Sequence, residues 1–400
     1  GRIAKGRIRL ADGSMCDDFG QPAPGYPDVR VQVTDARFYG AVALGGSTGA
    51  GEAYTNGWWT TDDLVGLIRL FVLNGDALSG IDSGWARLSM PLYRLARLFS
   101  RNTTRGSKRN IAAHYDLSND FFTLWLDRSM MYSSAIYPDD RATLEDAQAH
   151  KLRVIGRKLG LSAGDHLLEI GTGWGSLAIT AARDFGCRVT TTTISAEQAR
   201  YARAAVTAAG LADRVRVETL DYRELERAFG AGSFTKLASI EMVEAVGADH
   251  LDTYLSTCSR MLGPDGLALI QAILIRDQRY AAAQREPDFI QKHIFPGSFI
   301  PSHAVIAAAA ARVSEFTIAH YASFGEHYAR TLREWRARFM DARDRVAALG
   351  FDDRFQRMWE FYLAYCEGAF AERHITVGQF VFRKPGDRVG AECFEHGVRG

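Results

Sequence analysis

The sequence predicts an α/β protein with a doubly wound, mostly parallel sheet and a smaller N-terminal domain. From about residue 145, short apolar runs alternate with longer segments of helical periodicity, a pattern typical of βαβ units. A glycine-rich turn at 171–175 directly follows the first of these runs, as expected where a strand turns into a helix. With 400 residues and 47% hydrophobic content, the chain can form one large domain or two moderate ones.

The predicted elements of the larger domain follow one another regularly after a helix that ends near Leu159. Strands are predicted over 166–170, 187–194, 215–219, 237–242, 267–274, 316–320 and 375–382, and helical stretches over 176–185, 196–209 and 330–370. Such repetition implies a parallel sheet covered by helices on both faces. The last two strands flank a helical stretch, which suits a sheet that ends with an antiparallel strand.

Residues 1–105 are predicted to form a separate N-terminal domain, and residues 106–400 the second domain. Alternation at 29–33 predicts a strand, and the glycine-rich stretch 44–52 is grouped with it in a small β-containing unit. Apolar residues spaced by three and four predict a helix over 62–74. The basic, polar stretch 100–109 has the composition of a solvated linker and places the boundary near residue 105.

Composition and charge narrow the class of protein. The totals of 48 Lys and Arg against 47 Asp and Glu nearly cancel, so no global field attracts nucleic acid. Five scattered cysteines without a CxxC pair predict neither a disulfide framework nor a metal site, and they favour the cytoplasm. No apolar run approaches the roughly 18 residues of a membrane span. The first residues lack the apolar core of a signal peptide, so any membrane contact is expected to be local.

The glycine turn favours S-adenosylmethionine over a dinucleotide. Gly171, Gly173 and Gly175 give the spacing G-x-G-x-G, whereas a dinucleotide fingerprint is G-x-G-x-x-G. The second strand of the domain ends in 191–195 without the carboxylate that would bind ribose hydroxyls. Both differences argue against a nicotinamide cofactor.

Three polar residues near this turn are candidate cofactor contacts. Glu169 can accept hydrogen bonds from the amine of a methionine-like group or from loop amides, although a solvated acid at a strand end is the alternative. Asp221 follows a later strand and can accept from an adenine amino group at the carboxyl edge of the sheet. Gln198 is either a ligand contact or part of a capping box with Ser195.

Several spaced motifs carry a resemblance to a known family. The matching stretches are 114–122, 131–134, 169–175, 193–198, 221–223 and 294–297, with 51–54 and 62–64 nearer the N-terminus. Over 110–386, and more loosely before it, the chain resembles cyclopropane fatty acid synthases and related fatty-acyl phospholipid methyltransferases. The resemblance implies a class I methyltransferase-like fold and attack by a cis double bond of a phospholipid acyl chain on the methyl group of S-adenosylmethionine.

The resemblance also implies which residues contact the cofactor. They are Tyr132, Ser133, Glu169, Gly171, Gly173, Gly175, Thr193, Ile194, Gln198, Asp221 and Tyr222. Aromatic faces that would stabilise a carbocation are expected from Tyr132, Tyr137, Phe299 and Tyr328. Core packing is the alternative for all four, and for Phe299 it is the favoured one.

In this family a bound bicarbonate takes the proton, held by a cysteine, a glutamate, a histidine, a backbone amide and a tyrosine. By resemblance the glutamate is Glu244, the tyrosine Tyr328 and the amide that of Ile273. The cysteine position holds Ser134 and the histidine position Gln271, which can still bind an anion through a hydroxyl and an amide. A buried amide paired with backbone is the alternative for Gln271.

These two replacements leave the product open between a cyclopropane, with bicarbonate retained, and a methylene- or methyl-branched chain. A methyltransferase for a soluble small molecule and a non-catalytic acyl-chain or cofactor-binding protein are the other hypotheses. Arg87, Arg94 and Arg97 in the segment 85–99 are candidates for peripheral contact with the inner membrane face, against an ordinary amphipathic helix. The sequence leaves open whether the chain forms a homodimer.

Overall fold

The computed structural model describes residues 3–75, 117–285 and 288–388, which fall into two compact units. Unit 1 contains 3–75 together with 282–285, 288–296 and 329–375. Unit 2 contains 117–281, 297–328 and 376–388. The sequence assigned the segments of unit 1 after residue 105 to the second domain. The predicted boundary near 105, the predicted linker and the segment 85–99 lie outside the described residues.

Unit 1 contains a four-stranded sheet with the order β2-β1-β3-β4. Its strands are β1 (Gly6–Asp12), β2 (Met15–Gln21), β3 (Asp28–Val33) and β4 (Trp59–Thr61). Strands β1 and β2 form an antiparallel hairpin, β1 pairs with β3 in parallel, and β3 pairs with β4 antiparallel. Alternate residues of β3 are buried, so the strand predicted at 29–33 is confirmed.

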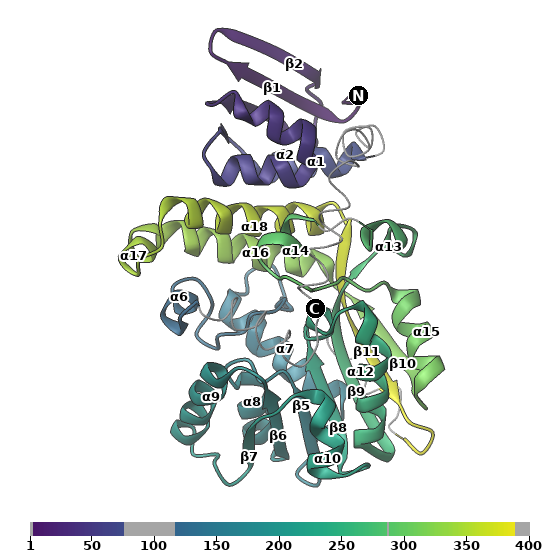
Figure 1. The fold of residues 1–400 in the computed structure, drawn as a ribbon. Helices are drawn as coiled ribbons and strands as arrows, with labels where there is room; N and C mark the ends of the chain where they lie inside the picture. Colours follow the sequence, from purple (N-terminus) through teal and green to yellow (C-terminus); the bar gives the residue numbers. More distant parts are fainter. Residues whose placement is uncertain (1–2, 76–116, 286–287, 389–400) are drawn as a thin grey trace. The chain divides into compact units, whose positions relative to one another are not determined.

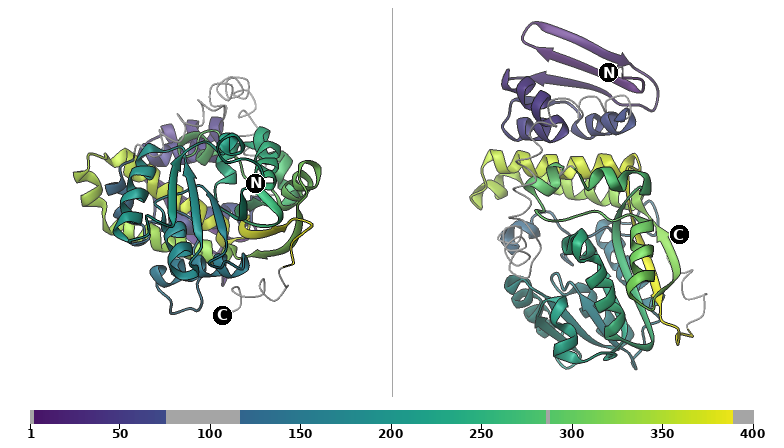
Figure 2. Two further views of the ribbon diagram at one scale, coloured as in Figure 1. Left: turned by 90° about the horizontal axis from the view of Figure 1, so that it is seen from below. Right: turned by 45° about the vertical axis from the view of Figure 1, so that its right-hand side comes forward.

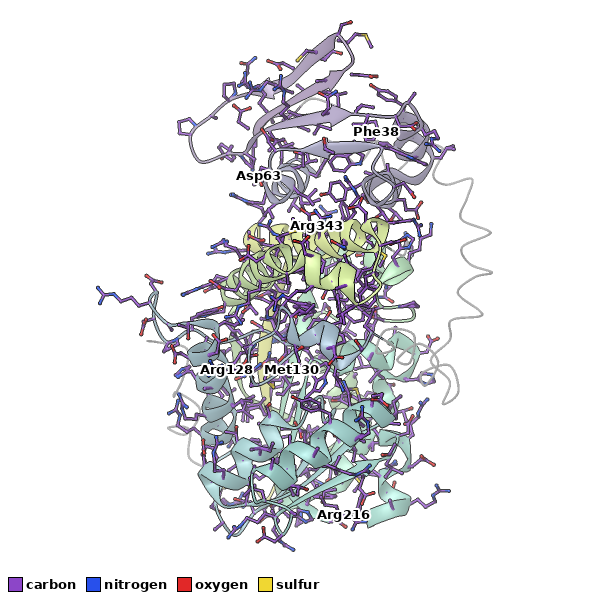
Figure 3. The ribbon with its side chains drawn as sticks, turned by 90° about the vertical axis from the view of Figure 1, so that its left-hand side faces the viewer. Phe38, Asp63, Arg128, Met130, Arg216 and Arg343 are labelled. Carbon is purple, nitrogen blue, oxygen red and sulfur yellow. The ribbon has the colours of Figure 1, made fainter. Side chains whose placement is uncertain are left out.

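Helices complete unit 1. They are α1 (Arg37–Thr55), α2 (Leu64–Leu73), α14 (Phe289–His293), the part of α16 (Gly325–Asp341) after residue 328, α17 (Arg343–Ala348) and α18 (Asp353–Ala371). The predicted helix at 62–74 is confirmed as α2. Asp63, labelled in Figure 3, caps this helix, since its carboxylate accepts a hydrogen bond from the Gly66 amide. The glycine-rich stretch 44–52 is helical, with a local break at Gly46, where φ is 55°.

Unit 2 contains a seven-stranded sheet with the order β10-β11-β9-β8-β5-β6-β7 (Figure 1). The strands are β5 (His166–Ile170), β6 (Arg188–Thr193), β7 (Val215–Thr219), β8 (Phe234–Ile240), β9 (Leu262–Ile275), β10 (Thr317–Ser323) and β11 (Ile375–Arg383). Strands β5 to β9 pair in parallel, and β10 pairs antiparallel with β11. The predicted mostly parallel sheet with an antiparallel end is confirmed.

Helices connect these strands. They are α6 (Asn119–Thr123), α7 (Leu144–Lys158), α8 (Ser176–Phe185), α9 (Ala196–Ala208), η2 (Tyr222–Glu224), α10 (Leu225–Phe229), α11 (Val243–Val246), η3 (Ala248–His250), α12 (Leu251–Met261), α13 (Asp277–Ala283) and α15 (His303–Val313). The predicted strand at 237–242 ends earlier than expected, at Ile240. The next two residues, Glu241 and Met242, leave the strand at the carboxyl edge of the sheet.

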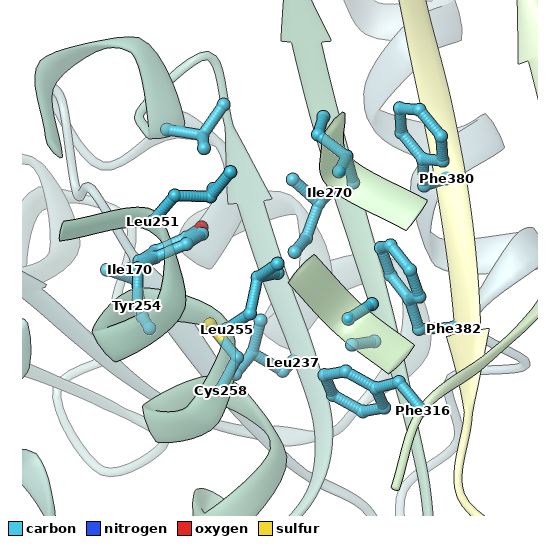
Figure 4. Packing of buried hydrophobic residues seen from close by; sticks show 14 of the residues in the cluster. Ile170, Leu237, Leu251, Tyr254, Leu255, Cys258, Ile270, Phe316, Phe380 and Phe382 are labelled. Atoms are coloured by element: carbon cyan, nitrogen blue, oxygen red, sulfur yellow. The ribbon is translucent and has the colours of Figure 1, made fainter. Parts of the chain in front are cut away.

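Alternate strand residues divide between two hydrophobic clusters, one on each face of this sheet. Leu167 and Val381 belong to the cluster that includes side chains of α7, α8 and α9. Leu168, Phe380 and Phe382 belong to the cluster with α12 and α15, shown in Figure 4. Helices therefore cover both faces, as Figure 2 also shows, and both faces of the strands are withdrawn from water.

Membrane spans and metal sites were both disfavoured by composition. Among the helices of the described residues, none combines the length and apolar character needed to cross a membrane. No group of three or more His, Cys, Asp and Glu side chains in the described part of the chain has the arrangement of a metal site.

The close packing of α2 on α18 leads to a stability prediction. A Cβ at Gly368 would lie 2.7 Å from Ile68 Cγ2 and 3.3 Å from the Arg69 backbone nitrogen. We expect Gly368→Ala to destabilise the protein by about 1–3 kcal/mol through overpacking. The same change at Gly40, a helical position with no atom within 4 Å of the added Cβ, should be neutral or stabilising. Thermal denaturation of both variants checks this, and equal effects would contradict it.

Candidate active site

The glycine turn joins β5 to α8 at the carboxyl edge of the sheet in unit 2. Gly171, Gly173 and Gly175 have φ values of 100°, 51° and 96°, which explains why glycine is favoured at each position. A Cβ at Gly173 would meet no atom within 4 Å, so the loop backbone there is open to close approach by a ligand. The Gly171 and Thr172 amides donate to the Thr192 carbonyl, which fixes the turn against β6.

Glu169 lies one residue before the end of β5 and is only 3% exposed. This contradicts the alternative of a solvated strand-end acid. Burial raises the pKa of Glu169 to about 8, while the Thr191 hydroxyl lowers it. Its Oε2 has no hydrogen-bond partner among the described residues. A buried acceptor beside an open glycine turn fits the amine of S-adenosylmethionine.

The segment 131–134 is positioned by a turn held by Asp127, whose carboxylate accepts from the backbone amides of Ser129 and Met131. Met130 within this turn has a positive φ of 56° (Figure 3). The Tyr132 ring then packs on Phe122 and Trp125, with ring centroids 5.5 and 5.4 Å apart.

Ser133 is buried, and its Oγ accepts from Lys151 Nζ at 2.7 Å. Both Ser133 and Tyr132 thus have defined neighbours within unit 2, which leaves their predicted cofactor contacts as proposals.

The remaining predicted cofactor residues follow β6 and β7. Thr193 Oγ1 donates to Gln198 Oε1 at 2.9 Å, and Ile194 between them is half-buried. The Ser195 hydroxyl accepts from the Gln198 amide, but the Gln198 side chain bonds Thr193, so only half of the expected capping box forms. Gln198 therefore orients Thr193 at the end of β6.

Asp221 and Tyr222 lie after β7. The Asp221 carboxylate accepts from the Arg223 guanidinium, at 2.8 Å from Nε and 2.6 Å from Nη2. The Tyr222 hydroxyl is buried without a hydrogen-bond partner among the described residues. An adenine contact of Asp221 stays a prediction, and such a contact would share the carboxylate with Arg223.

A second cluster lies around Glu241, at the end of β8. Its Oε1 accepts from the Ser134 amide at 2.9 Å and from Gln271 Nε2 at 2.7 Å. Its Oε2 accepts from the Tyr328 hydroxyl at 2.8 Å. The cluster therefore brings together three of the residues predicted to hold an anion, Ser134, Gln271 and Tyr328. The Ser134 hydroxyl, expected to bind that anion, instead donates to the Ala135 carbonyl, and only the Ser134 amide reaches the carboxylate.

Glu244 and Ile273 form the rest of the cluster. The Ile273 amide donates to Glu244 Oε1 at 2.5 Å, and Glu244 Oε2 is buried without a hydrogen-bond partner among the described residues. Burial and the neighbouring charge of Glu241 raise the pKa of Glu244 to about 8. Burial also raises the pKa of Glu241, while Lys151 and the donors Gln271, Ser134 and Tyr328 lower it. The charge of Glu241 thus disfavours ionisation of Glu244, and the ionised form of Glu241 is the better stabilised of the two.

Gln271 is held by side chains on both sides, which contradicts the alternative of an amide paired with backbone. Gln379 Nε2 donates to Gln271 Oε1 at 3.0 Å, and Lys158 Nζ donates to Gln379 Oε1 at 2.9 Å. Burial lowers the pKa of Lys158 to about 8. A chain of buried polar side chains thus connects β9, β11 and α7 to Glu241.

The predicted aromatic residues differ in their surroundings. Phe299 is part of the core cluster beside α12, as expected for a packing role. Tyr137 stacks on the His327 ring at 6.0 Å, and its backbone amide donates to His327 Nδ1. Only Tyr328 among these four is hydrogen-bonded to Glu241.

Sequence reasoning missed Glu241, Lys151, Lys158 and Gln379. Glu241 directly follows a strand and precedes Glu244 by three residues, and that pairing at the end of a buried strand was the available signal. Lys151 and Lys158 lie on α7, whose sequence pattern is that of an amphipathic helix with exposed charged residues. Their burial depends on neighbouring strands that are distant in the sequence.

Comparisons with known proteins identify the family of the chain. The family model for mycolic acid cyclopropane synthetase matches residues 102–380. The chain is 36% identical over 387 residues to the tuberculostearic acid methyltransferase UfaA1 of Mycobacterium tuberculosis, covering 95% of this chain and 88% of that protein. It is 35% identical over 360 residues to the cyclopropane-fatty-acyl-phospholipid synthase of Escherichia coli strain K12, covering 89% and 88%.

Solved structures similar to this chain include cyclopropane synthases. The cyclopropane synthase MmaA2 from Mycobacterium tuberculosis matches with a TM-score of 0.64 at 29% identity, over 69% of this chain and 98% of that one. The mycolic acid cyclopropane synthase CmaA1, in complex with SAH and CTAB, matches with a TM-score of 0.63 at 30% identity and the same coverage.

The sheet and the site define a class I S-adenosylmethionine-dependent methyltransferase. Within that class, the chain belongs to the mycolic acid cyclopropane synthetase family. The predicted resemblance, fold class and enzyme class are therefore confirmed.

The buried, uncharged Glu169 leads to a prediction about cofactor binding. A cationic amine favours the carboxylate, so binding of S-adenosylmethionine at pH 7 should release about one proton per complex. Between pH 6 and about 8, the affinity should rise with pH as the free carboxyl group ionises.

Titration calorimetry in buffers of different ionisation enthalpy measures the released proton. Glu169→Gln should weaken binding and abolish the proton release, and Gly173→Val should abolish binding by filling the open position. A binding heat that is the same in all buffers would contradict this role of Glu169.

Proposed function

We propose that the enzyme transfers the methyl group of S-adenosylmethionine to a cis double bond of an unsaturated phospholipid acyl chain and forms a cyclopropane. The observation that carries the proposal is the half-buried carboxylate pair, Glu241 and Glu244, at the sheet edge that also carries the glycine turn. A Cβ at Gly171 would lie 3.3 Å from Met242 Cγ, so the segment with both carboxylates adjoins the cofactor loop. The names of the two relatives, both lipid-modifying enzymes, support an acyl substrate.

When bound, S-adenosylmethionine supplies an electrophilic methyl group on a sulfonium. Glu169 would hold its amine, because Glu169 Oε2 is an acceptor without a hydrogen-bond partner among the described residues. The turn at 171–175 would pack closely against the cofactor, because the backbone at Gly173 is open to a ligand. An alkene is a weak nucleophile, so positioning in a site without water contributes much of the rate. Ring closure and formation of a methylene branch both release a proton, and the carboxylate pair is the group of the site that can accept it.

A second product is favoured by one comparison. The relative named tuberculostearic acid methyltransferase shares 36% identity across 95% of this chain. Loss of a methyl proton with ring closure gives a cyclopropane, whereas a hydride shift before the same loss gives a methylene branch. Ser134 and Gln271 are at positions where the cyclopropane-synthase pattern has cysteine and histidine, and both donate to Glu241. This contact supports a role of the two residues in the choice between the products.

Product analysis distinguishes these candidates. Incubation with S-adenosylmethionine and vesicles of monounsaturated phospholipid should increase the acyl mass by one CH2. Cyclopropane protons in the proton NMR spectrum support ring closure, while a new terminal alkene supports the methylene branch. No lipid product with any vesicle, while a soluble acceptor is methylated, would contradict the proposed substrate class.

Glu244→Gln tests the carboxylate pair. Gln keeps the shape of the side chain and its bond with the Ile273 amide, but it cannot take part in passing a proton from the pair to solvent. We expect turnover to fall by about 10²-fold or more, with cofactor affinity near that of the wild type. Lipid mass spectrometry and calorimetry measure the two quantities. An equal loss of cofactor affinity would place Glu244 in the cofactor site instead.

The substrate chain belongs to a bilayer, so we place the enzyme at the inner membrane face as a peripheral protein. Arg87, Arg94 and Arg97, outside the described residues, are the proposed contacts. Changing all three to Glu should abolish sedimentation with anionic vesicles, while the thermal stability and cofactor affinity stay unchanged. Unchanged sedimentation would contradict this contact.

A further inference from the structure

We propose that the carboxylate of Glu241 is the proton acceptor of the reaction and occupies the position that the family resemblance assigns to bicarbonate. This inference rests on the proposed function, because it concerns the proton lost after methyl transfer. It also predicts that the enzyme neither binds nor requires bicarbonate. The basis is the hydrogen bonding of the cluster around Glu241.

The residues expected to hold bicarbonate already donate to protein carboxylates, Ser134 through its backbone amide and not through its hydroxyl. The Ser134 amide, Gln271 Nε2 and the Tyr328 hydroxyl all donate to Glu241, at 2.7 to 2.9 Å. The Ile273 amide donates to Glu244. An external anion would have to displace Glu241 from three donors and would be placed beside two carboxyl groups. These residues therefore do not fit bicarbonate, and they do fit a carboxylate of the chain itself.

The charges around Glu241 favour its ionised form over that of Glu244. The titratable groups facing it are Lys151 on α7, Glu244 on α11 and Tyr328 on α16. Lys151 is fully buried, and its interaction with Glu241 opposes the effect of burial on the carboxylate. Glu244 accepts from backbone amides alone and has an unpartnered Oε2, so it is the partner that holds a proton.

A chain of hydrogen bonds sets the direction of the Gln271 amide. An ammonium group only donates, so Lys158 must bind the oxygen of Gln379. Gln379 then presents its NH2 to the Gln271 oxygen, which leaves the Gln271 NH2 to donate to Glu241. Lys158 thus acts as a positioning residue. Through Gln379 it keeps the Gln271 NH2 group directed at the Glu241 carboxylate.

The backbone at Glu241 is also consistent with a functional role. Its φ of 51° lies in the left-handed region, which is unfavourable for a residue with a side chain. Such conformations are retained at sites where the surrounding structure requires them. A glycine would adopt this conformation without strain, so replacement by glycine is compatible with the local backbone.

The proposed proton transfer needs no reactant besides S-adenosylmethionine, the acyl chain and Glu241. Methyl transfer leaves a carbocation on the acyl chain. Glu241 accepts one proton from the transferred methyl group, and the electron pair of that C–H bond forms the last ring bond. The carboxylate becomes a carboxylic acid, and one proton must leave the Glu241 and Glu244 pair for solvent before the next turnover.

The test compares the wild type with Glu241→Gly and Glu241→Gln, each with its fold verified by thermal denaturation and its cofactor site by calorimetry. The first readout is binding of carbon-13 bicarbonate, followed by NMR, and needs no lipid. We expect binding only to Glu241→Gly, because only this variant frees the three donors and vacates space.

The second readout is lipid methylation in buffer freed of bicarbonate and in buffer supplemented with it. The wild type should be equally active in both. Both variants should lose about 10²- to 10⁴-fold in turnover without bicarbonate, the range for loss of a general base. Added bicarbonate should restore Glu241→Gly with saturation and leave Glu241→Gln inactive, because its side chain still fills the position.

Binding of bicarbonate to the wild type, or loss of wild-type activity on its removal, would overturn the inference. Full activity of Glu241→Gln would overturn it as well. If the wild type methylates no lipid in either buffer, the proposed function fails, and the binding readout still decides whether Glu241 occupies the anion position.

Lys158→Met tests the positioning chain. Loss of the ammonium should weaken the donor at Glu241, so the acid limb of the kcat profile should move to higher pH. Activity should remain independent of bicarbonate. A lower kcat with an unmoved acid limb would indicate a purely structural role for Lys158.

Discussion

The burial of two carboxyl groups at one edge of a sheet is the constraint on which the rest of this site depends. Glu241 and Glu244 lie three positions apart in the sequence and are largely enclosed in unit 2. A buried carboxylate is stable only with donors or a compensating charge. Donors from a turn, a strand and a helix therefore converge on Glu241, and Lys151 supplies the charge.

This requirement explains how the elements of unit 2 contribute to the site. Strand β8 places Glu241 at the sheet edge, and β9 presents Gln271 from the neighbouring strand. The turn before α7 contributes the Ser134 amide, and the first turn of α16 contributes Tyr328. The glycine turn after β5 lies beside the same segment through the contact of Gly171 with Met242. Parallel strands bring their carboxyl ends to one edge, so the glycine turn and the Glu241 segment are adjacent by topology.

Membership of the cyclopropane synthetase family accounts for the cofactor half of the site. In the other half, the donors of Ser134, Gln271 and Tyr328 converge on a carboxylate of the chain itself. Ser134 and Gln271 both donate to Glu241, so these two differences from the family pattern have a common physical basis. Substitutions that look independent along the chain are coupled through a single carboxylate.

Periodicity and the glycine turn were sufficient to predict the alternating strands and helices around the larger sheet, its mostly parallel pairing and the cofactor class. Those features follow from local rules, because alternation and turn chemistry act over a few neighbouring residues. The partners of Glu241 could not be predicted, since Ser134, Gln271, Tyr328 and Lys151 are separated by up to almost two hundred residues. Only the tertiary structure decided that these donors surround a carboxylate of the chain, because burial and hydrogen bonding of a charge depend on distant segments meeting.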